Sequence, residues 1–230
     1  MKVAVIGLEF PLGKQPLADE RLEKLKHIFH SPETIFIQIE FQDAGHIKDA
    51  DGILCEKEKR LDLILADLEI IENRLSADAQ DKELLLRSKE SLEKEIFLNE
   101  VPFNDQEKRV LLGFNLVSLK PVSFQEKENA ASIPEMISSI YNNCGMISFF
   151  TVNEKQLRAW PVRKGTTVYE ASGSIHSDIQ RGFIKAEVVG YEDLIKCGGL
   201  NTAKGKGLVR LEGREYIVRD GDIIQIKFNV

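Results

Sequence analysis

The spacing of apolar residues predicts short strands and one helix in the first 55 residues. Residues 2–6 (KVAVI) are typical of a buried strand that ends at a glycine, and residues 19–29 carry leucine and isoleucine on one helical face. Residues 34–41 (TIFIQIEF) alternate apolar and polar positions, so we expect a strand with one buried side. The apolar run at residues 52–55 predicts another strand.

The segment 56–98 has a different pattern. It contains no Gly or Pro, is rich in Glu, Lys and Leu, and repeats its leucines at steps of three and four residues in two stretches. This periodicity predicts two helices folded back on each other as an antiparallel hairpin, each with one apolar seam. The many charges are expected to form the solvated face of the hairpin.

Two helix N-termini are predicted in the segment that follows the hairpin. Asn104 has the residue type of an N-cap and Glu107 follows it at the spacing of a capping box, which predicts a helix that begins there. The run Ser132-Ile133-Pro134-Glu135 opens a second helix, because proline is favoured in the first turn. Between the two helices, residues 115–124 have the composition of a strand.

The last third of the chain reads as two hairpins around one helix. The expected helix covers residues 166–175, with Thr166 or Thr167 as its cap. The other expected elements are a hairpin of residues 147–152 and 156–162, a strand at 183–189, a short helix at 191–196 and a last hairpin of residues 216–218 and 223–230. Two hairpins wrapped around a helix make a β-grasp module.

Composition places the chain among soluble globular proteins. Apolar residues are 43% and charged residues 30% of the sequence. No apolar run is long enough for a membrane span, the first strand is too short for a signal peptide, and the three cysteines lie far apart, so we expect a cytoplasmic protein without disulfides or a zinc site.

The charge is unevenly distributed. Residues 1–145 carry 18 Lys and Arg against 27 Asp and Glu, a net charge of −9, whereas residues 146–230 carry 13 against 10, a net charge of +3. A polyanionic partner would therefore meet the C-terminal module first.

The C-terminal module resembles the TGS domain of the YchF (Obg-like ATPase) family from residue 146 to the end. The matching motifs are Arg158-Ala159-Trp160, Gly165-Thr166, Ile175-His176, Arg181-Gly182-Phe183-Ile184, Tyr191-Glu192-Asp193 and Phe228-Asn229-Val230. Shorter runs at residues 2–8, 18–25 and 39–41 resemble the nucleotide-binding domain of the same family, and residues 63–69 resemble the start of its helical hairpin.

The phosphate-binding loop that this resemblance implies departs from its motif. A P-loop needs four residues between its glycines and a Lys followed by Ser or Thr, since its N–H groups hold phosphate and its hydroxyl binds magnesium. Here Gly7 and Gly13 enclose five residues, and Lys14 is followed by Gln15. The family's first helix and first switch are missing from the sequence. Gly7, Gly13 and Lys14 are the candidate phosphate contacts, and a surface turn is the structural alternative.

Two other nucleotide-binding motifs also depart from the pattern of the family. Asp43-Ala44-Gly45 is one residue short of the second switch, so Asp43 is a candidate magnesium ligand or else a loop cap. After Lys120-Pro121-Val122 the chain offers only residues 123–129 where the family reads the base. Phosphoryl transfer depends on positioned charge and metal, so we expect no hydrolysis and no cofactor. Bound ATP or GTP with magnesium is the alternative.

The basic residues of the C-terminal module are candidates for contact with RNA or another partner. Residues 202–207 (TAKGKG) form a small basic loop that could approach phosphates, or else a solvated connector. The family resemblance implies contact with the ribosome or RNA. The candidate contacts are Arg158, Arg163, Lys164, Arg181, Lys204 and Lys206.

These patterns lead to one hypothesis of fold and function. We expect an α+β protein in which a reduced P-loop-type α/β remnant (residues 1–55 and 99–145) carries the inserted helical hairpin (56–98) and a C-terminal TGS β-grasp domain (146–230). The expected function is non-hydrolysing binding or regulation, in which the TGS domain and the hairpin contact the ribosome, RNA or a protein partner. A residual ATPase or GTPase and a scaffold that pairs through its hairpin are the alternatives.

Overall fold

The computed structural model describes residues 1–77, 81–127 and 131–229 and divides the chain into two compact units. Unit 1 comprises Met1–Gln15 and Ile39–Cys144, and unit 2 comprises Pro16–Gln38 and Gly145–Val230. The sequence assigns all of residues 1–55 to the N-terminal remnant. The structure instead groups Pro16–Gln38 with the C-terminal module.

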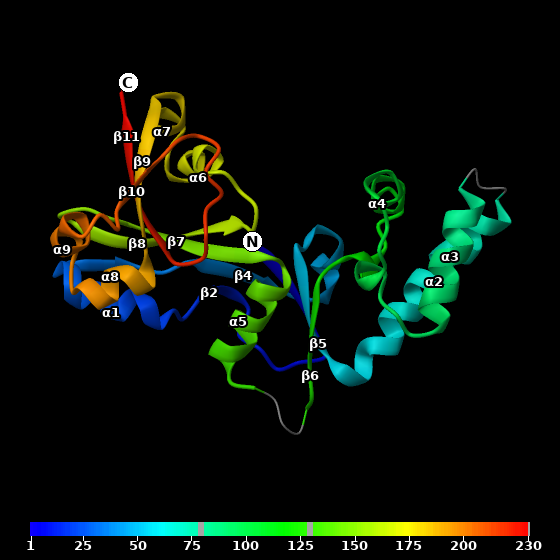
Figure 1. Cartoon of the computed structure of the whole chain (residues 1–230). Coiled ribbons are helices and arrows are strands. Elements are labelled where there is room, and N and C mark those ends of the chain that lie inside the picture. The colour runs from blue at the N-terminus through cyan, green and yellow to red at the C-terminus, as the bar shows by residue number, and fades with distance from the viewer. Residues whose placement is uncertain (78–80, 128–130, 230) are drawn as a thin grey trace. The chain divides into compact units, whose positions relative to one another are not determined.

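A five-stranded sheet in the order β2-β4-β1-β5-β6 forms the centre of unit 1. β1 lies between β4 and β5 and is parallel to both, and β5 is parallel to β6 (Figure 1). Val3, Ala4, Ile53 and Leu54 are fully buried, as expected of the central strands of a parallel sheet. The strands are β1 (Lys2–Ile6), β2 (Gly13–Pro16), β4 (Gln38–Gln42), β5 (Gly52–Glu56) and β6 (Val122–Gln125).

Two long helices follow β5 and pack side by side (Figure 1). They are α2 (Arg60–Ser76) and α3 (Lys82–Glu93), and their buried Ile71, Leu85 and Leu92 belong to one apolar cluster with Phe97. The remaining helical elements of unit 1 are α4 (Asp105–Leu112), α5 (Ile133–Asn143) and the 3₁₀ turns η1 (Ala44–Asp49), η2 (Lys57–Lys59), η3 (Leu98–Glu100) and η4 (Val117–Leu119). The capping box of Asn104 and Glu107 begins α4, as its sequence predicts.

A buried carboxylate attaches α2 to η4. The side chain of Asp67 accepts hydrogen bonds from the backbone N–H groups of Val117 (2.8 Å) and Ser118 (2.7 Å) and from the Ser118 hydroxyl (2.5 Å). These are the orphan N–H groups at the start of a helical turn. The prediction of a strand over residues 115–124 is therefore wrong in its first half, where η4 forms, and β6 begins only at Val122.

Unit 2 is a six-stranded sheet in the order β10-β9-β11-β7-β8-β3. Its strands are β3 (Glu33–Ile35), β7 (Met146–Val152), β8 (Gln156–Arg163), β9 (Phe183–Gly190), β10 (Arg210–Glu212) and β11 (Asp222–Phe228). Its helices are α1 (Glu20–Phe29), α6 (Val168–Ile175), α7 (Ser177–Arg181), α8 (Tyr191–Cys197) and α9 (Leu200–Gly205). Val168 and Ala171 of α6 pack on Phe149, Trp160 and Val188 of the sheet. Thr167, one of the two predicted caps, begins α6 and forms a capping box with Glu170.

Arg21 holds α1 in unit 2. Its guanidinium forms ion pairs with Asp19 and Asp220 at 2.8 Å each, and it lies 5.2 Å from the centre of the Phe150 ring. Asp220 also accepts a hydrogen bond from the N–H of Ser148 (2.9 Å). Burial alone would lower the pKa of Arg21, but the hydrogen bonds to Asp19 and Asp220 outweigh it and raise that pKa. Arg21 therefore stays charged and joins the start of α1 to the sheet.

Two further expectations are corrected by strand pairing. The predicted last hairpin is wrong, because β11 pairs with β9 and β7, while the backbone at Tyr216 and Val218 bonds to the start of α6. The predicted single strand at residues 34–41 is two strands, since β3 joins β8 in unit 2 and β4 joins β1 in unit 1. Within the described residues, no helix is both long enough and apolar enough to cross a membrane.

Candidate functional site

The carboxyl ends of β1, β5 and β6 lie next to one another in unit 1. Ile6 pairs with Cys55, and Glu56 pairs with Gln125, so the residues that follow these strands share one edge of the sheet. Open α/β sheets bind ligands outside the carboxyl ends of their strands, where the strand order reverses. β1 is flanked on both sides by later strands, so this edge is the candidate functional site.

Gly7 forms a tight turn at this edge against the side chain of Glu56. Gly7 has a φ of +75°, and a Cβ placed on it would lie 2.6 Å from Oε2 and 2.9 Å from Cβ of Glu56. The Glu56 side chain is only 8% exposed. A carboxylate thus packs directly on the turn in which a P-loop would hold phosphate.

Charged side chains pair with one another around Glu56. Lys57 contacts Glu126 at 2.5 Å and Lys127 contacts Glu56 at 3.4 Å, which links the ends of β5 and β6. The hydrogen bond with Glu126 raises the pKa of Lys57, and the same bond lowers the pKa of Glu126. Sequence reasoning did not single out Glu56 and Lys57, although they end and follow the buried strand β5, which is the signal that could have found them.

The chain between Gly7 and α1 contains no helix. Residues 1–77 are all described, and the segment after the Gly7 turn runs into the strand β2, which contains both Gly13 and Lys14. Gly13 has a φ of +92° with open space around its Cα, and Lys14 is exposed. A helix after the loop would supply unpaired N–H groups to an anion, and this segment offers no such helix.

Asp43 is used as a cap. Its Oδ1 accepts a hydrogen bond from the N–H of Gly45 (2.8 Å) at the start of η1 and lies 3.2 Å from Nδ1 of His46. The bond from Gly45 lowers the pKa of Asp43. Among the residues that the structure describes, no group of three or more His, Cys, Asp or Glu side chains is placed to hold a metal ion.

The candidate base-reading segment is only partly described. The hydroxyl of Ser123 in β6 lies 2.7 Å from that of Ser139 in α5, and Glu126 is paired with Lys57. Residues 128 and 129 lie outside the described residues.

At least three of the six basic candidates of unit 2 are engaged within the protein. The Arg158 guanidinium lies 3.8 Å from the centre of the Trp160 ring, Lys204 contacts Glu187 at 2.8 Å, and Arg181 forms an ion pair with Asp178. Arg163, Lys164 and Lys206 are exposed.

The structure does not bring the six onto one face. Arg158 and Arg163 lie in the same strand five positions apart, so they point to opposite faces of the sheet. The predicted loop at residues 202–207 is largely the helix α9, whose N–H groups bond within it, so only the Lys204 and Lys206 side chains remain as contacts. Arg214 was missed. It is exposed and lies 4.9 Å from the centre of the Tyr169 ring, and no sequence motif marks it.

Comparison with known proteins finds similarity to one family. A family model described as YchF-GTPase_C, a protein of unknown function (DUF933), matches residues 146–229. The chain is 28% identical to the ribosome-binding ATPase YchF of Bacillus subtilis over 327 aligned positions, which cover 95% of this chain and 89% of the relative. The chain is thus similar to YchF (Obg-like ATPase) proteins over most of its length. The alignment is longer than the 230 residues of this chain, so at least 97 positions of the B. subtilis YchF face gaps.

Other YchF relatives match over a shorter stretch. The ribosome-binding ATPase YchF of Mycoplasma genitalium is 41% identical over 103 residues, which are 45% of this chain and 28% of that protein. Human Obg-like ATPase 1 is 44% identical over 99 residues, which are 43% of this chain and 25% of that protein. The chain thus matches about a quarter of the length of these two relatives.

A solved YchF structure shares the fold. The YchF GTPase of Schizosaccharomyces pombe superposes with a TM-score of 0.77 at 17% identity and covers 93% of this chain and 86% of that one. This similarity confirms a mixed α/β architecture of the YchF type.

Proposed function

We propose that this chain is a non-hydrolysing member of the YchF family that binds the ribosome through its C-terminal TGS-type β-grasp module. Ribosome binding is inferred from the B. subtilis and M. genitalium relatives, which are named ribosome-binding ATPases. The net charge of +3 on residues 146–230 supports a contact with ribosomal RNA through this module, since phosphates dominate binding to nucleic acid.

The packing of Glu56 on the Gly7 turn is the observation that carries the non-hydrolysing part. A phosphate in that turn would meet a carboxylate within van der Waals distance of the glycine, and two like charges so close repel strongly. Lys57 and Lys127 already form ion pairs with the two glutamates at this edge of the sheet. The residues therefore do not fit a nucleotide phosphate.

The residues also do not fit a magnesium ion beside the phosphates. Magnesium in a P-loop needs a hydroxyl after the lysine, and Gln15 follows Lys14 here. Asp43 already accepts the N–H of Gly45. ATP or GTP with magnesium is accordingly the alternative that the first experiment addresses.

Calorimetric titration of the full chain with ATP and with GTP, each with magnesium, tests the alternative. We expect no saturable heat, and no phosphate release in a parallel hydrolysis assay. Micromolar binding that Lys14→Ala abolishes would show that the nucleotide site is retained, and phosphate release that the same variant abolishes would reject the non-hydrolysing proposal.

Co-sedimentation with ribosomes tests the second half of the proposal. We expect the full chain to pellet with ribosomes at low salt, and the double variant Arg163→Ala/Lys164→Ala at the end of β8 to pellet less. Each lost phosphate contact should lower the slope of log affinity against log salt by about 1.

A second double variant, in unit 1, controls for the change in net charge. Lys108→Ala/Arg109→Ala removes an exposed basic pair from α4 and changes the net charge by the same amount. Equal loss in both double variants would show a nonspecific effect, and no pelleting of the full chain would reject ribosome binding.

A further inference from the structure

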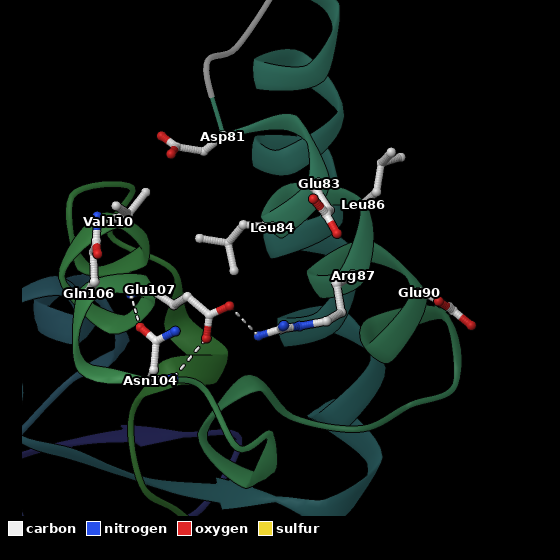
Figure 2. A pocket seen from close by; sticks show the side chains of 10 residues that line it. All are labelled: Asp81, Glu83, Leu84, Leu86, Arg87, Glu90, Asn104, Gln106, Glu107 and Val110. Atoms are coloured by element: carbon white, nitrogen blue, oxygen red, sulfur yellow. Dashed lines mark hydrogen bonds and ion pairs between the residues drawn. The ribbon is translucent and has the colours of Figure 1, made fainter.

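A groove of about 670 Å³ lies between α3 and α4 in unit 1 (Figure 2). Its volume falls within the range of about 300–1,000 Å³ that is usual for binding sites. None of the candidate nucleotide or ribosome contacts lines it. The groove is therefore a separate surface from the edge of the parallel sheet.

An ion pair holds the two walls of the groove together. Nη2 of Arg87 on α3 contacts Oε1 of Glu107 on α4 at 2.9 Å, and Oε2 of Glu107 accepts the N–H of Asn104 at 2.7 Å (Figure 2). The guanidinium also lies 4.8 Å from the centre of the Phe103 ring. The groove is thus preformed, and the charge of Arg87 is already engaged.

Apart from Arg87, the charged side chains that line the groove are carboxylates. Asp81 and Glu83 lie at the start of α3, while Glu90 farther along pairs with Lys94 at 2.7 Å. With Arg87 neutralised by Glu107, the end of the groove near Asp81 and Glu83 is acidic.

An apolar strip crosses the same groove. Leu84 is half-buried and points from α3 toward α4 in Figure 2, and Val110 lines the opposite wall. Leu86, on the neighbouring surface of α3, is 49% exposed. Acidic side chains beside an apolar strip are complementary to a segment that has both basic and apolar side chains.

We propose that this groove binds a basic, partly apolar segment of a partner protein. Lysine or arginine side chains of the partner contact Asp81 and Glu83, and an apolar side chain rests on Leu84 and Val110. RNA is disfavoured here, because its phosphates would face two carboxylates and Arg87 is paired. The proposal concerns unit 1 and does not depend on ribosome binding by unit 2.

Fluorescence anisotropy of the full chain tests the groove with a short labelled peptide of lysine and leucine. We expect saturable binding that weakens at high salt, and no binding of the same peptide with glutamate in place of lysine or of a labelled oligouridine. Asp81→Asn/Glu83→Gln should weaken binding of the lysine peptide about three- to tenfold.

A second double variant separates the groove from total charge. Glu58→Gln/Glu69→Gln removes two exposed carboxylates outside the groove and should leave the affinity unchanged. Val110→Ser, which keeps every charge, should weaken binding of the peptide, with its fold checked by circular dichroism. Equal loss in both carboxylate variants, no effect of Val110→Ser, tighter binding of oligouridine, or no binding of the lysine peptide would each overturn the proposal.

Discussion

At the scale of single residues, Asp67 is a buried carboxyl group that constrains unit 1. Its side chain is fully buried, and its two oxygens accept three hydrogen bonds from Val117 and Ser118. Asp67→Asn replaces one accepting oxygen with an NH₂ group, which leaves a buried N–H or O–H donor without an acceptor. Such a donor typically lowers the free energy of unfolding by about 1–3 kcal/mol. Urea unfolding should show this loss, and Asp62→Asn, an exposed change on the same helix, should leave the unfolding midpoint near that of the parent chain.

The stability that Asp67 contributes should depend on pH. Burial raises the pKa of Asp67 above 3.8, so the folded chain keeps a proton that the unfolded chain has already lost. This contribution is complete below pH 3.8 and is lost as the pH rises through the raised pKa. The stability gap between the parent chain and Asp67→Asn should therefore shrink as the pH rises from 3.8 through the raised pKa, and a gap that widens would contradict the assignment.

Gly7 and Gly13 have similar backbones and different surroundings. Both have positive φ, but only at Gly7 would an added Cβ meet another side chain, at 2.6 Å from Glu56. Gly13→Ala should cost about 1–2 kcal/mol for the backbone alone. Gly7→Ala should cost a further ~1–3 kcal/mol for the collision. Equal losses in denaturant unfolding would show that Glu56 moves away freely, and would weaken the case against a phosphate in this turn.

At the scale of elements, the sequence predicts features that depend on neighbouring residues, such as helix caps. It does not predict which strands pair with each other. The cap of α4 follows from two residues three positions apart, and the cap of α6 is Thr167, one of the two threonines that the sequence offers. The run at residues 34–41 divides between two sheets, which depends on partners far along the chain. Local sequence likewise gives no sign that the Glu56 side chain packs on Gly7. The strand ends were therefore predictable, but their mutual packing was not.

Arg21 should control how firmly α1 is held in unit 2. It bonds to Asp19 and Asp220, and it is only partly exposed. Arg21→Ala removes the link to Asp220 while Asp19 still caps the helix through the backbone N–H of residue 21. Amide hydrogen exchange in α1 should accelerate about 5- to 30-fold, a loss of about 1–2 kcal/mol in local stability. Lys24→Ala, an exposed change on α1, should leave exchange unaltered.

At the scale of the whole molecule, the C-terminal module is not continuous in sequence. The family model covers residues 146–229, yet Pro16–Gln38 belongs to the same compact unit. β3 extends the sheet beside β8, and the apolar face of α1 is fully buried at Leu22 and Leu25. A cut before Met146 would separate these parts, so point variants are better tests of ribosome binding than truncation.

The isolated segment 146–230 should be unstable for the same reason. Without Pro16–Gln38 it leaves the edge of β8 unpaired and exposes the apolar surface that α1 covers, and both favour aggregation. A synthetic peptide of residues 16–38 should bind this fragment and raise its Tm, because a ligand of the folded state alone stabilises it by mass action. The same peptide with Arg21→Ala should bind more weakly, since it lacks the contact with Asp220. A fragment that unfolds at the same temperature with and without the peptide would show that residues 146–230 fold independently of the N-terminal segment.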